Sequence, residues 1–140
     1  MGEESIRNII LVILNAVFEG TATGETFNAN GKTDIMLSYQ GKVLFIAECK
    51  VFDGIKKHID TIDQLVSYTA WRDTKSAIIV FNRNKNMSKV VKKVKNSIEE
   101  HKLFKKVLDE GESSVLSLFG HKDDINRELY LSTMIYDLPK

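Results

Sequence analysis

Two short runs of the sequence, residues 43–47 and 77–81, are continuously apolar, and the stretch between them has helical periodicity. Strands that are apolar on both faces are typical of the centre of a sheet that is covered by other elements. The pattern predicts a helix over residues 56–72, and one stripe carries Ile55, Ile59, Ile62, Leu65, Val66 and Thr69. A strand, a helix and a second strand in this order favour a crossover with parallel pairing, which indicates an α/β fold.

The remaining elements are expected to complete a sandwich with a mixed central sheet flanked by helices. The spacing predicts helices over residues 3–18 and 87–104, strands over 34–39, 43–50, 114–119 and 128–136, and a short strand at 26–28. The predicted order is therefore α-(β)-β-β-α-β-α-β-β. A chain of 140 residues has room for one domain, 1–140, which could be a whole small protein or a domain of a larger one.

Composition excludes several classes of protein. A single cysteine, Cys49, rules out an intramolecular disulfide and a cysteine-cluster zinc site, and it fits a reducing, cytoplasmic environment. The longest run without a charge, residues 8–18, has 11 residues, which is too short to span a bilayer. We therefore expect no membrane partner. The formal net charge of +1 does not by itself indicate a partner.

Charged residues are expected where two neighbouring strands begin and end. Asp34 opens the strand 34–39, and Glu48 and Lys50 close the strand 43–50. Residues two apart on a strand share a face and lie about 6.6 Å apart, so Glu48 and Lys50 point the same way. Charges at the end of a buried strand are costly unless they have partners. An ordinary ion pair between Glu48 and Lys50 is the simplest alternative, and Asp34 could simply cap a turn.

The loop between these strands decides whether Asp34 joins the other two residues. A three-residue loop at positions 39–41 would pair Asp34 with Ile46 and place it on the face of Glu48. A two-residue loop at positions 40–41 would pair Asp34 with Ala47 and place it on the opposite face. Gly41 favours the three-residue loop, or a bulge with the same effect.

Two carboxylates that converge on one point repel each other unless a hard cation lies between them. Mg²⁺ binds one or two carboxylates and keeps several waters, and Mn²⁺ is a common substitute. A lysine beside such a site can steer the attacking water and stabilise charge that develops on a phosphate. Gln64 and Tyr68, an i,i+4 pair on the next helix, could fold back over the strand ends. These groups suit phosphodiester hydrolysis.

The motifs Gly31-x-x-Asp34, Glu48-x-Lys50 and Gln64-x-x-x-Tyr68, in this order, resemble the PD-(D/E)XK nuclease superfamily. The last two are similar to its RecB-like branch, and residues 47–50 with 61–64 resemble Mrr-type restriction endonuclease domains. The resemblance covers residues 3–82 and departs at Thr33, where the superfamily has proline. It implies a restriction-endonuclease-like fold and a divalent-metal-dependent nuclease, with DNA the favoured substrate and RNA the alternative.

The resemblance also implies roles for individual residues. Asp34 and Glu48 would be metal ligands, together with the main-chain carbonyl of Cys49. Lys50 would position or activate the water, and Gln64 would support the site or hold a phosphate. The first helix would contribute a further acidic ligand, Glu4 or alternatively Glu3. Cleavage of both strands with one active site per chain would favour a homodimer.

A basic segment follows the second apolar strand. Residues 83–106 contain nine lysines and arginines against two acids, and Lys89, Lys92 and Lys93 lie off the apolar stripe. This pattern indicates either a solvated helix face or a surface for the phosphate backbone, to which Tyr68 and Arg72 would add contacts. A catalytically silent module that binds nucleic acid or a partner protein, within a larger defence or repair protein, is the alternative function. The three histidines, His58, His101 and His121, are expected on the surface.

Overall fold

The computed structural model describes the main chain of residues 26–29, 34–39, 42–68, 75–121 and 123–138, with Gly2 and Ser5. Side chains are described within residues 46–66, 75–121 and 123–138. The predicted helix over residues 3–18, with Glu3 and Glu4, therefore lies outside the described residues, as does Arg72. For Asp34 and Tyr68 the structure gives the main-chain position only.

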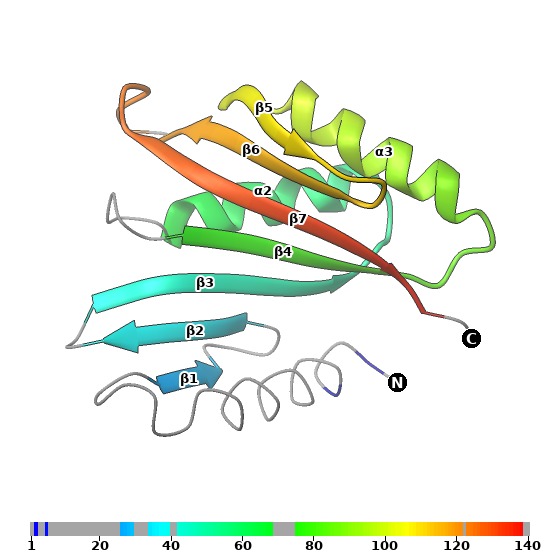
Figure 1. The fold of residues 1–140 in the computed structure, drawn as a ribbon, viewed down its shortest axis with the longest axis horizontal. Helices are drawn as coiled ribbons and strands as arrows, with labels where there is room; N and C mark the ends of the chain where they lie inside the picture. Colours follow the sequence, from blue (N-terminus) through cyan, green and yellow to red (C-terminus); the bar gives the residue numbers. More distant parts are fainter. Residues whose placement is uncertain are drawn as a thin grey trace.

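The described strands form one mixed sheet with the order β1-β2-β3-β4-β7-β6-β5 (Figure 1). Pairing is parallel between β3 and β4 and between β4 and β7, and antiparallel elsewhere. The parallel crossover predicted from the two apolar runs is confirmed, as is the mixed α/β class. The bounds are β1 Thr26–Ala29, β2 Asp34–Tyr39, β3 Lys42–Val51, α2 Ile55–Tyr68, β4 Lys75–Asn82, α3 Met87–Glu100, β5 Phe104–Glu110, β6 Ser114–Gly120 and β7 Glu128–Asp137.

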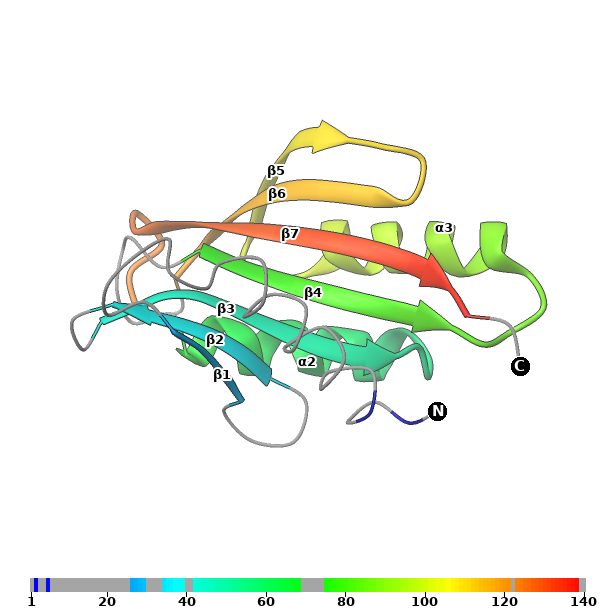
Figure 2. The ribbon, with the colours of Figure 1, turned by 60° about the horizontal axis from the view of Figure 1, so that its bottom comes forward.

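The two described helices pack on one face of the sheet (Figure 2). Their apolar stripes share one core cluster with alternate residues of β3, β4, β6 and β7, because side chains alternate between the two faces of a strand. This cluster contains Ile46, Ile62, Leu65, Val66, Ile78, Val80, Val90, Val94, Ile98, Val115, Phe119, Leu129, Leu131 and Ile135. The helices therefore lie over the face on which the even-numbered residues of β3 project.

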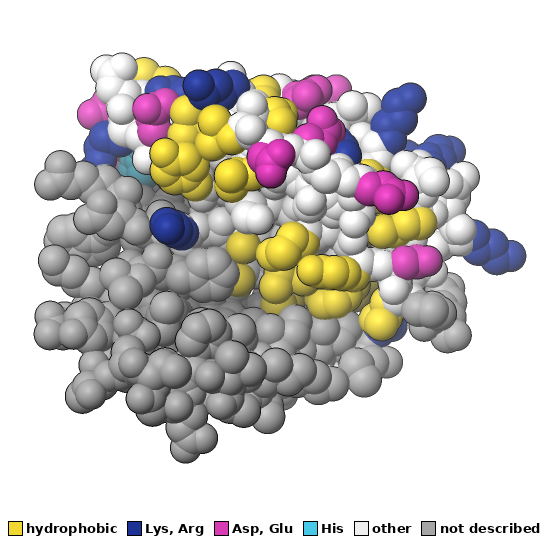
Figure 3. Space-filling model, in the orientation of Figure 1, with side chains coloured by type: hydrophobic (Ala, Val, Ile, Leu, Met, Phe, Trp, Pro, Cys, Tyr) yellow, Lys and Arg dark blue, Asp and Glu magenta, His cyan; other side chains and the backbone are white. Residues whose placement is uncertain are grey.

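The opposite face of the sheet carries a second apolar cluster, which includes Cys49 and Phe81. Cys49, the single cysteine of the sequence, is fully buried, as expected for a small core residue between Glu48 and Lys50. On the same face, hydrophobic side chains gather over β4 and β7 (Figure 3). The ring of Tyr136, on β7, lies tilted against that of Phe81, with the ring centroids 6.2 Å apart. No helix in the described part of the chain is long and apolar enough to cross a membrane.

The sequence prediction was wrong at the end of the third helix, which was expected to reach residue 104. Helix α3 begins at the N-cap Asn86, whose side chain accepts a hydrogen bond from the Lys89 N–H at 3.1 Å, and it ends at Glu100. His101 then adopts an extended conformation, and its ring Nδ1 accepts a bond from the Leu103 N–H. The chain continues as β5, a strand that the prediction missed, so the order is wrong by one element.

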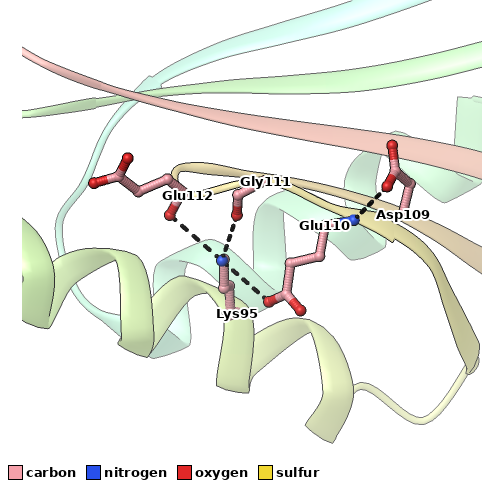
Figure 4. A network of polar contacts seen from close by, with 5 residues as sticks. All are labelled: Lys95, Asp109, Glu110, Gly111 and Glu112. Carbon is pink, nitrogen blue, oxygen red and sulfur yellow. Dashed lines mark hydrogen bonds and ion pairs between the residues drawn. The ribbon is translucent and has the colours of Figure 1, made fainter.

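Strand β5 ends in a tight turn that is fastened to α3 by one lysine. Lys95 Nζ donates to the carbonyl oxygens of Gly111 at 2.8 Å and Glu112 at 3.4 Å (Figure 4). It also lies 3.0 Å from Glu110 Oε1. The flexible lysine stem thus reaches from the helix to a turn whose carbonyl groups would otherwise depend on water.

Replacing Lys95 by methionine, which keeps most of the apolar stem, is expected to lower the free energy of unfolding by about 1 kcal/mol. The expected loss of stability is small because the ion pair between Lys95 and Glu110 is partly exposed to solvent, and exposed ion pairs contribute little. Urea denaturation measures the change. Lys92→Met, on the exposed side of the same helix, is the control and should change stability by less than about 0.5 kcal/mol. Equal effects would contradict the role given to the turn contacts.

Candidate active site

The backbone pairing brings Asp34 opposite Glu48. The two residues are direct partners in the antiparallel register of β2 and β3. Directly opposite residues lie on the same face of a sheet, so Asp34 shares the face of Glu48 and, two residues along the strand, of Lys50. The three predicted site residues therefore occupy adjoining positions on the face over which α2 and α3 pack.

This register differs in detail from the one expected from the sequence. Tyr39 pairs with Lys42, so the connection has two residues and the favoured three-residue loop was wrong. The register then shifts between Leu37 and Ser38, because Leu44 is left without a partner between Val43 and Phe45. A bulge of this kind reverses the facing of every residue beyond it. The alternative of a bulge is thus confirmed, although the partner of Asp34 is Glu48 and not the expected Ile46.

Glu48 is a buried carboxylate, with its side chain only 4% exposed, and Lys50 Nζ lies 3.6 Å from Glu48 Oε1. The Lys50 side chain is 34% exposed, so it is partly accessible to solvent, whereas Glu48 is buried. A buried carboxylate is stable only when cations or hydrogen-bond donors compensate its lost hydration. The ion pair that the Glu-x-Lys spacing left open as the simpler alternative is therefore present, with one member buried and the other partly exposed.

A cavity of about 300 Å³ lies beside Lys50, at the connection between the end of β3 and the start of α2. Gly54, with a φ of 94° that suits only glycine, turns the chain from the strand into the helix. Gln64 lines the same cavity as Lys50, so these two predicted site residues are brought together. The lining residues are Lys50, Val51, Phe52, Asp53, Lys57, His58, Asp60, Thr61, Gln64 and Val80.

His58 is a cavity residue that the sequence analysis missed and wrongly placed on the surface. It is 5% exposed, and burial lowers the pKa of its imidazole from 6.5 to about 4, because charging the ring would cost hydration energy. Its Nε2 is buried and has no hydrogen-bond partner among the described residues. The signal was available: His58 precedes the buried Ile62 by four residues, so both occupy the same side of α2.

The pKa of His58 makes stability depend on pH. The unfolded chain takes up this proton near pH 6.5, whereas the folded chain resists it down to about pH 4. Acid therefore favours the unfolded state, and lowering the pH from 7 to 4.5 should remove roughly 2 kcal/mol through this residue. Urea denaturation of His58→Phe and the wild type at both pH values measures the difference. A pH dependence that is unchanged in His58→Phe would contradict this assignment.

The other two histidines are also buried, contrary to expectation, and both have structural roles. His101 Nε2 lies 2.6 Å from Asp63 Oδ1 of α2, while its Nδ1 accepts the Leu103 N–H. These bonds require the proton on Nε2 and join the end of α3 to α2. His121 Nδ1 similarly accepts the Asp123 N–H at 3.2 Å.

The basic side chains predicted to contact nucleic acid lie on the outer side of α3. Lys89 and Lys92 are exposed and Lys93 is partly exposed. Both helices begin where the parallel strands β3 and β4 end (Figure 1), so α3 starts at the same edge of the sheet as the cavity. The carboxyl edge of parallel strands is the usual place for a ligand in α/β proteins.

The residue types at the strand ends are ones that a hard divalent cation prefers. Asp34 and Glu48 are residues with oxygen donors on adjoining strands, and magnesium prefers carboxylate oxygen and water. Among residues whose side chains are described, no cluster of three histidine, cysteine, aspartate or glutamate residues suited to a metal is found. The side chains of Asp34 and Glu4 are not among those described. The proposed ligands Asp34, Glu48, Glu4 and the main-chain carbonyl of Cys49 therefore stay predictions.

Comparisons with known proteins give no relative on which to base a function. No protein-family model matches the sequence. No curated protein matches it, and no solved structure matches it either. The geometry of the site is therefore the basis for assigning a function.

Proposed function

We propose that this chain is a divalent-metal-dependent nuclease that hydrolyses phosphodiester bonds in DNA, with the site architecture of the PD-(D/E)XK superfamily. The observation that carries the proposal is the pairing of Asp34 with Glu48, with Lys50 on the same face. A binding module has no need for two carboxylates at this position beside a lysine. The location of Gln64 in the cavity next to Lys50 adds support.

Each of these residues would have a role in the proposed reaction. Asp34 and Glu48 would hold Mg²⁺, which when bound supplies a Lewis acid for the phosphoryl group and makes water a better nucleophile. Lys50, accessible to solvent and close to Glu48, would orient the water and stabilise negative charge on the phosphate. Gln64 would hold a phosphate oxygen. Attack of water on phosphorus breaks a phosphorus–oxygen ester bond and leaves a phosphate monoester and a free hydroxyl group.

Incubation of plasmid and single-stranded DNA with Mg²⁺ or Mn²⁺, with and without EDTA, tests the proposal. The wild type should cleave only in the presence of metal, and Asp34→Ala and Lys50→Ala should not cleave. Cleavage that persists in both variants, or no cleavage by the wild type with any divalent metal, would remove the enzymatic assignment. A retarded but intact DNA band would instead favour the binding module.

Lys92→Ala combined with Lys93→Ala is expected to weaken DNA binding and to flatten its dependence on salt. Each lost phosphate contact should lower the slope of log K against log salt by about 0.9. The measurement is a fluorescence-anisotropy titration at several salt concentrations without divalent metal. Lys105→Ala is the control, because Lys105 lies on β5 and is paired with Glu128. An unchanged slope for the double variant would identify α3 as an ordinary solvated helix.

A further inference from the structure

The cavity beside Lys50 is lined by apolar and uncharged polar side chains as well as by charged ones. Val51, Phe52 and Val80 supply apolar surface, and Phe52 is aromatic. Uncharged polar groups come from one side of α2, namely His58, Thr61 and Gln64. A volume of about 300 Å³ is at the lower end of the range for small-molecule sites, so the cavity suits one compact ligand.

The charged groups around this cavity balance one another among the described residues. Two lysines, Lys50 and Lys57, line it together with two acids, Asp53 and Asp60. Lys57 is hydrogen bonded to Asp53, and Lys50 pairs with Glu48. An anionic ligand would therefore meet little surplus positive charge in this cavity, and a ligand with uncharged polar groups suits it better.

His58 adds an observation that points to a ligand. Its buried Nε2 lacks a hydrogen-bond partner among the described residues, and leaving such an atom unpaired in the folded state is costly. The only other such atom in the described part of the chain is Thr133 Oγ1, on β7. Thr133 is not among the residues that line the cavity. Because Nε2 is buried, the ring must shift slightly to meet a ligand, as hydrogen bonds in empty sites often tighten only on binding.

We propose that the cavity binds a nucleobase, with Phe52 against its flat face and His58 hydrogen bonding to its polar edge. The inference rests on the proposed nuclease function, because it identifies the base as part of the nucleic-acid substrate. A base inside a cavity cannot remain paired or stacked in a duplex. The substrate class is therefore single-stranded or locally unpaired nucleic acid, whose bases commonly stack on aromatic side chains.

Titration of the metal-free protein with deoxynucleosides, followed by NMR of the histidine side-chain nitrogens, tests this proposal. Deoxynucleosides should shift the His58 resonances and saturate at millimolar concentration, whereas inorganic phosphate should leave them unchanged. A shift with phosphate and none with any nucleoside would overturn the proposal in favour of a phosphate site. No shift with either would show that the cavity is not a ligand site.

Two variants separate recognition from folding. His58→Phe keeps an aromatic ring but loses the hydrogen bond, so nucleoside affinity should fall about tenfold without a lower melting temperature. Thr133→Val removes the other buried side-chain atom that lacks a partner among the described residues, and it should leave nucleoside affinity unchanged. A lower melting temperature of His58→Phe with unchanged affinity would assign His58 a purely structural role and overturn the proposal.

The outcome also separates this proposal from the nuclease assignment. Nucleoside binding needs neither metal nor catalysis, so Asp34→Asn should bind nucleosides like the wild type. A protein that binds nucleosides at His58 but never cleaves DNA would retain the base site and lose the nuclease function. If the protein cleaves DNA but binds no nucleoside, the nuclease function would stand and the base site would be ruled out.

Discussion

Asp34→Asn is expected to reduce metal-dependent DNA cleavage by about a thousandfold or more, while the protein stays folded and binds DNA at least as tightly. The substitution keeps the size of the side chain and removes one of two carboxylates at directly opposite positions of β2 and β3. Loss of a metal ligand removes several kcal/mol of transition-state stabilisation, and each 1.4 kcal/mol is about a tenfold change in rate. Binding should not weaken, because a negative charge beside the phosphate is lost.

Single-turnover cleavage of a labelled oligonucleotide, with saturating protein, measures the chemical step and keeps binding out of the comparison. Asp109→Asn is the matched control: it makes the same chemical change at an exposed position of β5 and should cleave at the wild-type rate. Thermal melts of both variants exclude unfolding as the cause. Wild-type turnover by Asp34→Asn would show that Asp34 is not a ligand, even if the protein is a nuclease.

The centre of the fold was predictable because its sequence signals are physically redundant. Residues 43–47 and 77–81 are apolar without interruption, and a helical stripe separates them, so burial on both faces and parallel pairing follow together. The spacing of Glu48, Lys50 and Gln64 then placed these residues near one point. Lys50 and Gln64 do line one cavity, because α2 folds back along β3.

The position of Asp34 was harder to predict, for the same reason that β3 was easy to find. When a strand is apolar on both faces, a shift by one residue exchanges one apolar face for another. The hydrophobic pattern therefore could not reveal that Leu44 is bulged. Gly41 favoured a register of that parity through a three-residue loop, whereas the backbone reaches the same parity through a two-residue connection and a bulge.

Strand β5 and the buried histidines were missed because their signals are weak or depend on tertiary contacts. Residues 104–110 carry four charged side chains and are largely exposed, as is common for a strand at the edge of a sheet. Periodicity instead favoured an extension of α3. The helix ends where His101 bonds to Asp63 of α2, and no local pattern indicates that distant partner.

Phe119→Ala is expected to lower the free energy of unfolding by about 3–5 kcal/mol, which is a large fraction of the total for a domain of this size. Phe119 is fully buried in the core cluster beneath α3. Its ring centroid lies 5.4 Å from that of His101 and 5.9 Å from that of Phe104, which it meets edge to face. Truncation therefore removes apolar burial and two aromatic contacts, and it leaves a cavity between β6, β5 and the end of α3.

Urea denaturation at 25 °C measures the loss, with Tyr130→Ala as the control. Tyr130 is an aromatic residue of the adjoining strand β7, but it is 51% exposed, so its truncation should cost less than about 1 kcal/mol. Because Phe104 begins β5, amide hydrogen exchange in β5 should accelerate more than exchange in β3. A small, uniform effect of Phe119→Ala would contradict the packing of β5 and α3 around this ring. It would not bear on the cavity beside Lys50, which Phe119 does not line.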